Sequence, residues 1–206
     1  MEKYVYEGKT KDQVLNLALY ELNVNEKEII YNVKEENAGL FKGKKIIIEC
    51  IKIKDIANYA KELLLEILKG MKIEAKIEST IKEDFIKLNI HSENNSIIIG
   101  KKGHILDALQ IYIKNAINNE TNKFLKITVD VEGYKDKQAY FLERDAKKVA
   151  REVLKTKTDI KLDPMKAYER KIIHDILNNY RNIETISEGI EPNRCIVIKY
   201  VDKKTE

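Results

Sequence analysis

The apolar positions of residues 1–54 predict a small βαββ unit. After a short β-prone run, the four residues that begin at Thr10 match a capping box at the start of a helix. Apolar residues at three- and four-residue spacing then give this helix one apolar face. Residues 28–34 and 44–53 are rich in β-branched residues, and the glycine-containing segment 37–43 between them predicts a turn. We therefore expect one helix and three strands in this part of the chain.

From Asp55 the apolar period becomes that of a helix, with Asp55 as its N-cap and Gly70 just past its end. Alternating residues then predict two half-buried antiparallel strands with a break at 79–82. A short helical turn, a long amphipathic helix and a final strand follow. These five elements are expected at residues 73–78, 86–90, 96–99, 105–117 and 125–131. The order of the unit is αββααβ, and we place it at residues 55–134.

The last part of the chain, residues 135–206, predicts an ααββ unit. Its first helix is expected over about 136–155, and Asp163 followed by Pro164 favours the start of a second helix that reaches about Tyr180. Two strands joined by a turn are expected at residues 183–187 and 194–201. The sequence shows no internal repeat and no low-complexity linker. It therefore predicts an α+β fold of three small modules.

The composition excludes several classes of protein. Of the 206 residues 35% are charged, and no stretch approaches the roughly 18 consecutive apolar residues of a membrane span. The N-terminus lacks the apolar region of a signal peptide, so we expect a cytoplasmic protein without direct membrane insertion. Cys50 and Cys195 have no Cys or His neighbour at metal-ligand spacing. We expect both to be reduced and buried, and we expect no bound metal or cofactor.

The distribution of charge is more informative than the net charge of +4. Residues 136–206 carry 16 basic and 13 acidic side chains, which is three of the four net positive charges. They also contain all five arginines, and arginine can grip a phosphate with a planar fork. A surface that binds RNA or DNA is one interpretation, and ordinary solubilising charge is the other.

The segment Gly100-Lys101-Lys102-Gly103 is the first candidate nucleic-acid site. Two glycines three residues apart let a nucleic-acid backbone approach closely, and the amides at a helix N-terminus favour a phosphate. Lys101 and Lys102 would add charge, and the preceding Ile98 and Ile99 could line an apolar groove for bases. Such turns also join many ordinary pairs of helices. Between two helices of an αββααβ unit, however, the segment resembles the loop of a type II KH domain, whose groove clamps about four unpaired nucleotides.

The second candidate is the pair Arg170 and His174. Residues four apart share a helix face, and Lys166 lies one turn earlier. No carboxylate or nucleophile stands at a spacing that would make the histidine catalytic. An exposed face with one phosphate-binding cation and one stacking ring is our interpretation. The alternatives are a solvated charged face, or a structural pair in which His174 anchors its helix to the strand that begins at Arg194.

A third candidate is a basic stripe on the helix that precedes this pair. Its residues recur at spacings of three and four, with Glu143 and Glu152 beside them. The basic residues of the stripe are Arg144, Lys147, Lys148, Arg151 and Lys155. The stripe is either a solvated helix face with internal ion pairs or a path for phosphates between two binding modules, to which Lys148 and Arg151 would contribute.

Several motifs of the chain together resemble the Jag family, also called KhpB or the SpoIIIJ-associated protein. Gly100 to Gly103 match the KH loop of this family. The segment around Arg170 and His174, together with the later Arg194, resembles its single-stranded nucleic-acid-binding domain named for the Arg-x-x-x-His motif. The resemblance covers essentially the whole chain. It departs from the family in two ways: residues 39–43 stand where a lysine-preceded Gly-Phe-x-Gly turn is usual, and the long charged linker of many members is missing.

This resemblance implies a Jag-type N-terminal domain, a KH domain and an Arg-x-x-x-His domain at residues 1–54, 55–134 and 135–206. It implies a bacterial protein that binds single-stranded RNA, with single-stranded DNA as the alternative ligand, and that regulates transcripts linked to the cell envelope or cell division. A homodimer, or a heterodimer with a small KH protein, is a further implication. The competing hypothesis is a protein adaptor for a membrane insertase or a cell-division partner. An enzyme is disfavoured because no nucleophile, metal cluster or phosphate-binding fingerprint occurs.

Overall fold

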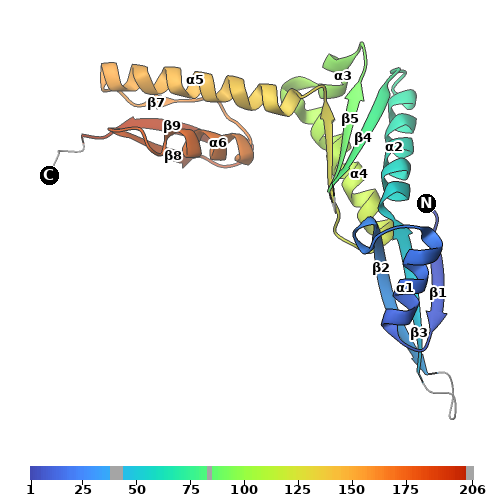
Figure 1. Cartoon of the computed structure of the whole chain (residues 1–206). Coiled ribbons are helices and arrows are strands. Elements are labelled where there is room, and N and C mark those ends of the chain that lie inside the picture. The colour runs from blue at the N-terminus through green and yellow to red at the C-terminus, as the bar shows by residue number, and fades with distance from the viewer. Residues whose placement is uncertain (38–43, 83–84, 203–206) are drawn as a thin grey trace. The chain divides into compact units, whose positions relative to one another are not determined.

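The computed structural model describes residues 1–37, 44–82 and 85–202 (Figure 1). These residues form a mixed fold of helices and small sheets, which confirms the predicted α+β class. The chain divides into two compact units, residues 1–132 and 133–206. The finer division into three modules, with boundaries near residues 54 and 134, stays a prediction. Residues 38–43, which include most of the predicted turn, lie outside the described residues.

The first unit begins with an antiparallel sheet of strand order β1-β3-β2 and one helix. The helix lies beside this sheet (Figure 1). Its Val14 and Ala18 share a buried core with Ile48 and Cys50 of the sheet. Its start is set by Thr10, whose hydroxyl oxygen accepts a hydrogen bond from the Gln13 amide at 3.4 Å. The elements are β1 (Tyr4–Gly8), α1 (Lys11–Leu22), the 3-10 turn η1 (Glu26–Glu28), β2 (Ile29–Asn37) and β3 (Lys44–Lys52).

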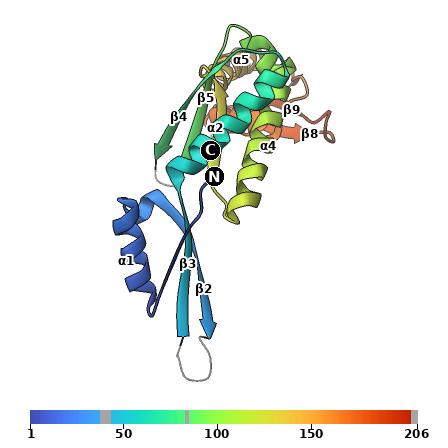
Figure 2. The ribbon, with the colours of Figure 1, turned by 90° about the vertical axis from the view of Figure 1, so that its right-hand side faces the viewer.

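The rest of the first unit has the predicted order αββααβ. Strand β5 is central, antiparallel to β4 and parallel to β6. Helices α2 and α4 cover one face of this sheet (Figure 2), where Leu88 is fully buried together with Leu64 and Ile113. The elements are α2 (Ile53–Gly70), β4 (Lys76–Lys82), β5 (Phe85–His91), α3 (Asn95–Ile99), the 3-10 turn η2 (Lys101–Gly103), α4 (His104–Thr121) and β6 (Lys126–Val131).

Two local predictions in this part are wrong. Asp55 is not the N-cap of α2, because the chain passes from β3 directly into a helix that begins at the buried Ile53. The expected break at 79–82 is also absent, since Thr80 pairs with Lys87 in the β4–β5 ladder. The side chains of residues 79–82 are exposed on both faces of the strand, so the alternation is lost while the backbone pairing continues.

The second unit packs two helices against a sheet of strand order β7-β9-β8. Its core contains Ala150 and Val153 of the first helix, Ile173 of the second, and Ile196 and Ile198 of the central strand. The elements are α5 (Tyr134–Thr156), β7 (Ile160–Lys161), α6 (Ala167–Leu177), β8 (Ile183–Glu188) and β9 (Cys195–Tyr200).

The segment before α6 differs from the prediction. The helix begins at Ala167 rather than at Asp163, and it ends at Leu177 rather than near Tyr180. The reason is backbone pairing with β9: the Leu162 amide donates to the Ile196 carbonyl at 2.8 Å. The two-residue strand β7 just before it pairs with β9 in the same way. Pairing with the sheet therefore overrides the local preference for a helix start.

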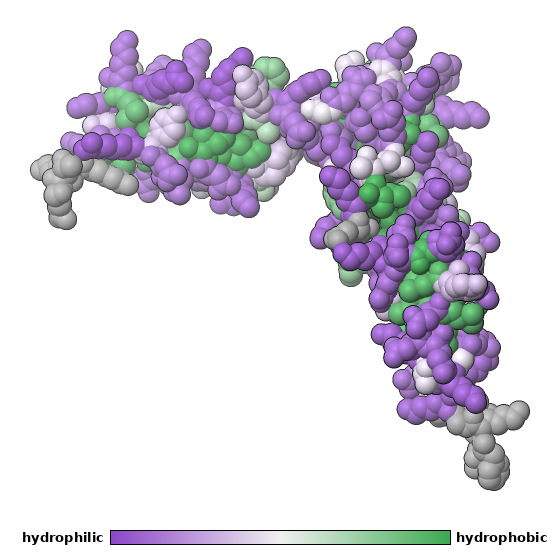
Figure 3. Space-filling view, in the orientation of Figure 1, coloured by the Kyte–Doolittle hydropathy of each residue, from purple (hydrophilic) through white to green (hydrophobic). Residues whose placement is uncertain are grey.

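Both cysteines lie in the described part of the chain, where they are buried and form no disulfide, as expected. Burial raises the pKa of the Cys50 thiol. The face of the molecule shown in Figure 3 is dominated by hydrophilic residues. Among the described residues, no helix combines the length and the apolar composition needed to cross a membrane.

Candidate nucleic-acid interface

The turn between α3 and α4 has a backbone that requires glycine. Gly100 has φ 70° and ψ −178°, a combination that is essentially restricted to glycine. A Cβ atom at this position would lie 2.6 Å from Cγ1 of Ile105, which is shorter than any ordinary contact. Gly103 is also left-handed, with φ 74°, and its amide donates to the Gly100 carbonyl at 3.2 Å. The two glycines thus close a tight loop directly before α4.

The loop presents its two lysines at the start of a long helix. Lys101 and Lys102 are exposed, and α4 continues for 18 residues from His104. Gly103 is the N-cap of α4 and supplies no capping side chain. The positive end of the helix dipole and the amides of its first turn therefore add to the charge of the lysines. This arrangement suits an anion, and a phosphate in particular.

The isoleucines before the loop do not all face outward. Ile98 is completely buried, whereas Ile97 is 51% exposed and Ile99 is half-buried. Successive residues of a helix point in directions about 100° apart, so one of three adjacent isoleucines in α3 must face the core. The expectation that Ile98 lines a groove is therefore corrected. Ile97 and Ile99 remain as apolar side chains beside the loop.

Arg170 lies in the interior of the second unit instead of on an exposed helix face. It is 6% exposed, and its Nη1 donates to the Met165 carbonyl oxygen at 2.7 Å. Its Nη2 forms an ion pair with Glu191 Oε1 at 2.8 Å. The Met165 amide in turn donates to the Arg194 carbonyl at 3.1 Å. Arg170 therefore ties the start of α6 to the turn between β8 and β9.

His174 is half-buried and faces β8. Its Nδ1 lies 2.6 Å from the Thr185 hydroxyl oxygen, and its Nε2 lies 3.0 Å from the Ser187 hydroxyl oxygen. Both ring nitrogens thus have a partner on β8. Of the two alternatives to a binding role, anchoring to a neighbouring strand agrees with the geometry, but the strand is β8 and not β9.

The remaining residues of the motif gather at one end of α6. Lys166 is the N-cap of this helix and is half-buried, and its amide donates to Glu169 Oε2 at 2.7 Å. The side chain of Arg194 is half-buried, and its Nε is a buried atom without a hydrogen-bond partner among the described residues. The structure therefore brings Lys166, Arg170 and Arg194 together and places His174 further along, against the sheet.

The basic stripe on α5 is divided by its ion pairs. Lys147 bonds to Glu143, which raises the pKa of the lysine, and Arg144 pairs with Asp145 at 3.3 Å. Lys148 and Arg151 are exposed, and in the part of the chain that the structure describes neither forms an ion pair. The internal ion pairs of the first interpretation are therefore present at Arg144 and Lys147, whereas phosphate binding by Lys148 and Arg151 stays a prediction.

Sequence reasoning did not single out Thr185 and Glu191 as partners of the paired motif. The sequence did contain a signal for Thr185, because alternation along a strand puts Thr185 and Ser187 on the same face. Glu191 lies three residues before Arg194, between β8 and β9. Its contact with Arg170, however, depends on how the turn folds back over α6.

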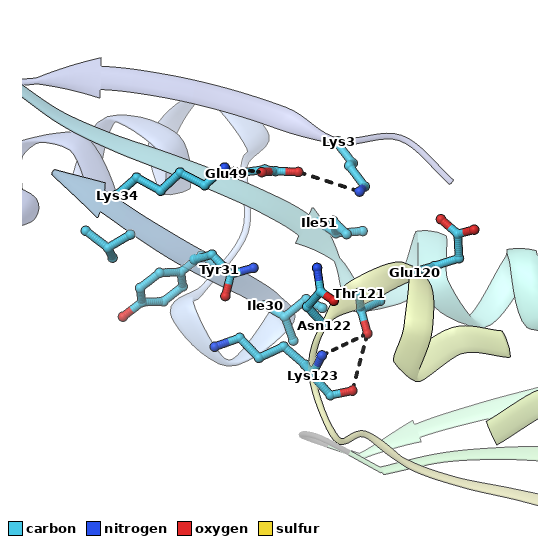
Figure 4. Close-up of a pocket in the computed structure, with 12 residues that line it drawn as sticks. Lys3, Ile30, Tyr31, Lys34, Glu49, Ile51, Glu120, Thr121, Asn122 and Lys123 are labelled. Atoms are coloured by element: carbon cyan, nitrogen blue, oxygen red, sulfur yellow. Dashed lines mark hydrogen bonds and ion pairs between the residues drawn. The ribbon is translucent and has the colours of Figure 1, made fainter. Parts of the chain in front are cut away.

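One pocket of about 290 Å³ lies in the first unit, beside β2, β3 and the end of α4 (Figure 4). None of the predicted site residues lines it. Its central carboxylate, Glu49, is shared between Lys3 at 3.6 Å and Lys34 at 3.8 Å. Because this charge is neutralised by neighbouring side chains, the pocket gives no independent sign of a ligand.

Comparison with known proteins finds a family match for each of the two regions that hold the candidate sites. Residues 56–131 match the family described as "KhpA/KhpB, KH domain", and residues 141–200 match the family of the Arg-x-x-x-His domain. The chain is 34% identical over 201 residues to the RNA-binding protein KhpB of Bacillus subtilis, covering 94% of this chain and 96% of that protein. It is 30% identical over 203 residues to the RNA-binding protein KhpB of Clostridium symbiosum, covering 96% of this chain and 91% of that one.

The chain belongs to the KhpB family. This confirms the resemblance seen in the sequence. The KhpB protein of Streptococcus pneumoniae is 33% identical over 146 residues, which cover 71% of this chain but 44% of that protein. The region that matches the KH family contains the Gly100–Gly103 loop of this chain. The region that matches the Arg-x-x-x-His family contains Arg170, His174 and Arg194.

Replacing Gly100 by alanine tests the backbone of the KH loop. The substitution forces a residue with a Cβ into a glycine-only conformation and against Ile105, so we expect a loss of about 1–3 kcal/mol in the free energy of unfolding. Gly133→Ala is the matched control, because Gly133 also has a positive φ, of 72°, but has open space around it. Urea unfolding followed by circular dichroism measures both. Equal losses in the two variants would show that the contact with Ile105 has no effect.

Replacing Arg170 by alanine tests whether this residue supports the fold. It removes two charge-assisted hydrogen bonds from a buried site, and we expect the second unit to lose about 2–3 kcal/mol of stability. Arg181→Ala, at an exposed position of the same unit, should have little effect. Thermal unfolding and RNA titration of both variants give the answer. If Arg170→Ala unfolds like the unchanged protein and only binds RNA more weakly, its main role is a direct contact with the ligand.

Proposed function

We propose that this protein binds single-stranded RNA through the KH loop and the Arg-x-x-x-His domain, and that it acts on the RNA by binding alone. Its relatives in two bacteria, each matched over at least 91% of their length, are named RNA-binding proteins. The matched KH and Arg-x-x-x-His regions together contain all the predicted site residues. Single-stranded rather than duplex RNA is proposed because grooves of the KH type hold unpaired nucleotides.

The observation that carries this proposal is the KH loop. The glycine-only conformation of Gly100 turns the chain so that two exposed lysines stand at the N-terminus of α4. Such a loop can hold a phosphate with amides, helix dipole and side-chain charge at once. The exposed Ile97 and the half-buried Ile99 supply apolar surface next to it for the bases.

The Arg-x-x-x-His domain would contribute a second contact. Arg170 is held by Glu191, whose side chain is 57% exposed. We propose that a phosphate displaces this carboxylate, or that it binds Lys166 and Arg194 beside it while Arg170 keeps the turn in place. His174 would then act through its hydrogen bonds to β8 as a positioning residue. In this proposal Arg170 and His174 hold in place the segments that contact RNA, and Arg170 can also contact the RNA itself.

Regulation of transcripts in the cytoplasm, linked to the cell envelope or to cell division, is the cellular role that we propose with this activity. A second candidate is a protein adaptor, and the first sheet favours it. Only one face of that sheet packs against α1, and Val5 on the other face is 58% exposed. A copy of the same chain, a small KH protein or a membrane insertase would be the partner. A protein partner retained at high salt, with RNA lost, would support the adaptor.

Reversing the charge of the KH loop tests the main proposal. Lys101→Glu with Lys102→Glu places two carboxylates where a phosphate would bind, so we expect affinity for single-stranded RNA to fall at least about tenfold. The slope of log affinity against log salt is negative, and its magnitude should fall by about 1.4, because each phosphate that the protein no longer neutralises removes roughly 0.7 from that magnitude. Fluorescence anisotropy of a labelled oligouridine at several salt concentrations measures both quantities.

The matched control is Lys54→Glu with Lys114→Glu. These lysines are exposed on α2 and α4 of the same unit, so the net charge changes equally. If the control weakens binding as much as the loop variant does, attraction by the overall charge explains the binding and the loop has no special role. Single-stranded DNA of the same sequence, titrated in parallel, decides between the two nucleic acids.

A further inference from the structure

The outer face of α5 differs from the rest of the helix. Ala146, Ala150 and Val153 lie on the side that packs into the core of the second unit. The residues on the opposite side recur at spacings of three and four, and all are exposed. We call this set the α5 outer face: Lys137, Tyr140, Phe141, Arg144, Lys148, Arg151 and Lys155. Five cations and two aromatic rings thus share one side of a single helix.

Two aromatic rings mark the N-terminal part of this face. Tyr140 is 63% exposed and Phe141 is 50% exposed. Their ring centroids are 5.8 Å apart in an edge-to-face arrangement. The guanidinium of Arg144 lies 5.2 Å from the centre of the Phe141 ring. Contiguous exposed apolar side chains are a feature of surfaces that another molecule covers.

Cations follow the aromatic rings along the helix. Lys148, Arg151 and Lys155 form no ion pair within residues 1–37, 44–82 and 85–202. Carboxylates are found at the edge of the face, where Asp145 pairs with Arg144. From Phe141 to Lys155 the helix rises about 21 Å, at 1.5 Å per residue. The two aromatic rings and these three cations therefore occupy successive parts of one side of α5.

We propose that the α5 outer face binds single-stranded nucleic acid, with bases stacked on Tyr140 and Phe141 and phosphates contacting Lys148, Arg151 and Lys155. Aromatic rings combined with a line of cations are the features that hold unpaired strands without sequence preference. Arginine beside an aromatic ring adds a second planar surface for a base. This inference rests on the proposed function and adds to it a stacking site outside the KH loop and the paired motif.

Other occupants fit the face less well. A membrane surface would need an apolar helix face free to insert, and the apolar side of α5 is already packed in its own core. An acidic protein segment would satisfy the cations but would gain little from the two rings. An unpaired nucleic-acid strand uses both kinds of side chain at once.

The absence of tryptophan from the chain allows a direct test. Phe141→Trp introduces a single indole into the proposed stacking site, and a stacked base should quench its fluorescence when unlabelled oligouridine is added to the full-length protein. Tyr20→Trp is the matched control, because Tyr20 is 85% exposed and belongs to α1, which is part of the other unit. Quenching in the first variant alone supports the inference. Equal quenching in both, or none in either while RNA binds, overturns it.

Affinity measurements separate the two kinds of contact. Tyr140→Ala with Phe141→Ala should weaken binding about tenfold or more and leave the salt slope unchanged, because stacking involves no counterion release. Lys148→Gln with Arg151→Gln should instead reduce the magnitude of the salt slope by about 1.4. Tyr20→Ala with Phe124→Ala removes two other exposed rings and should have no effect. Unchanged affinity of the Tyr140 and Phe141 variant would exclude the stacking site.

Further outcomes identify what fails if the result is negative. If the unchanged protein does not bind oligouridine at all, the proposed function fails together with this inference. If the KH-loop variant weakens binding while the α5 variants do not, the inference alone fails. Inorganic polyphosphate should compete for the cations without quenching Phe141→Trp. Equal quenching by polyphosphate, or tighter binding of polyglutamate than of RNA, would assign the face to anions or acidic proteins instead of bases.

Discussion

Each three-stranded sheet of this protein has to bury one apolar face beneath helices, because so few strands are marginally stable alone. Ile48 under α1, Leu88 under α2 and α4, and Ile196 beside α5 and α6 meet this requirement. One side of each of these helices is consequently buried against a sheet. The places left for binding chemistry are the turns between helices, their N-termini and their outer faces. The KH loop and the outer face of α5 are features of this kind.

The parts of the fold that follow from burial periodicity could be predicted from the sequence. Apolar residues alternate along the strand around Leu88 and repeat at helical spacing through Leu64, because the structure buries one face of each element. The first and last residues of helices and strands could be predicted less well, because they depend on competition between local and long-range hydrogen bonds. Asp163 followed by Pro164 favours a helix locally, but the Leu162 amide pairs with Ile196 on β9. A partner more than thirty residues away in the sequence cannot be read from a local pattern.

The candidate site shows the same division. The place of the Gly100 loop between two helices followed from the pattern of elements, and the left-handed conformations of both glycines agree with their residue type. The burial of Arg170 did not follow, because a charged residue on an amphipathic helix is expected to be solvated. The Met165 carbonyl and the Glu191 carboxylate make its burial tolerable, and both come from segments that fold over α6. The burial of Ile98 did not follow either, since a helix as short as α3 has no clear apolar period.

The burial of both sulfur atoms has a consequence for redox chemistry. The thiolate is the reactive form of cysteine, and at Cys50 burial raises the pKa of the thiol and so lowers its thiolate fraction. The Cys195 thiol is also enclosed, with its sulfur 3.6 Å from the Glu188 carbonyl oxygen. While the protein is folded, both cysteines are therefore protected from peroxide and from cross-linking through disulfides. A cysteine introduced on its surface would be the one position at which a thiol-reactive label attaches.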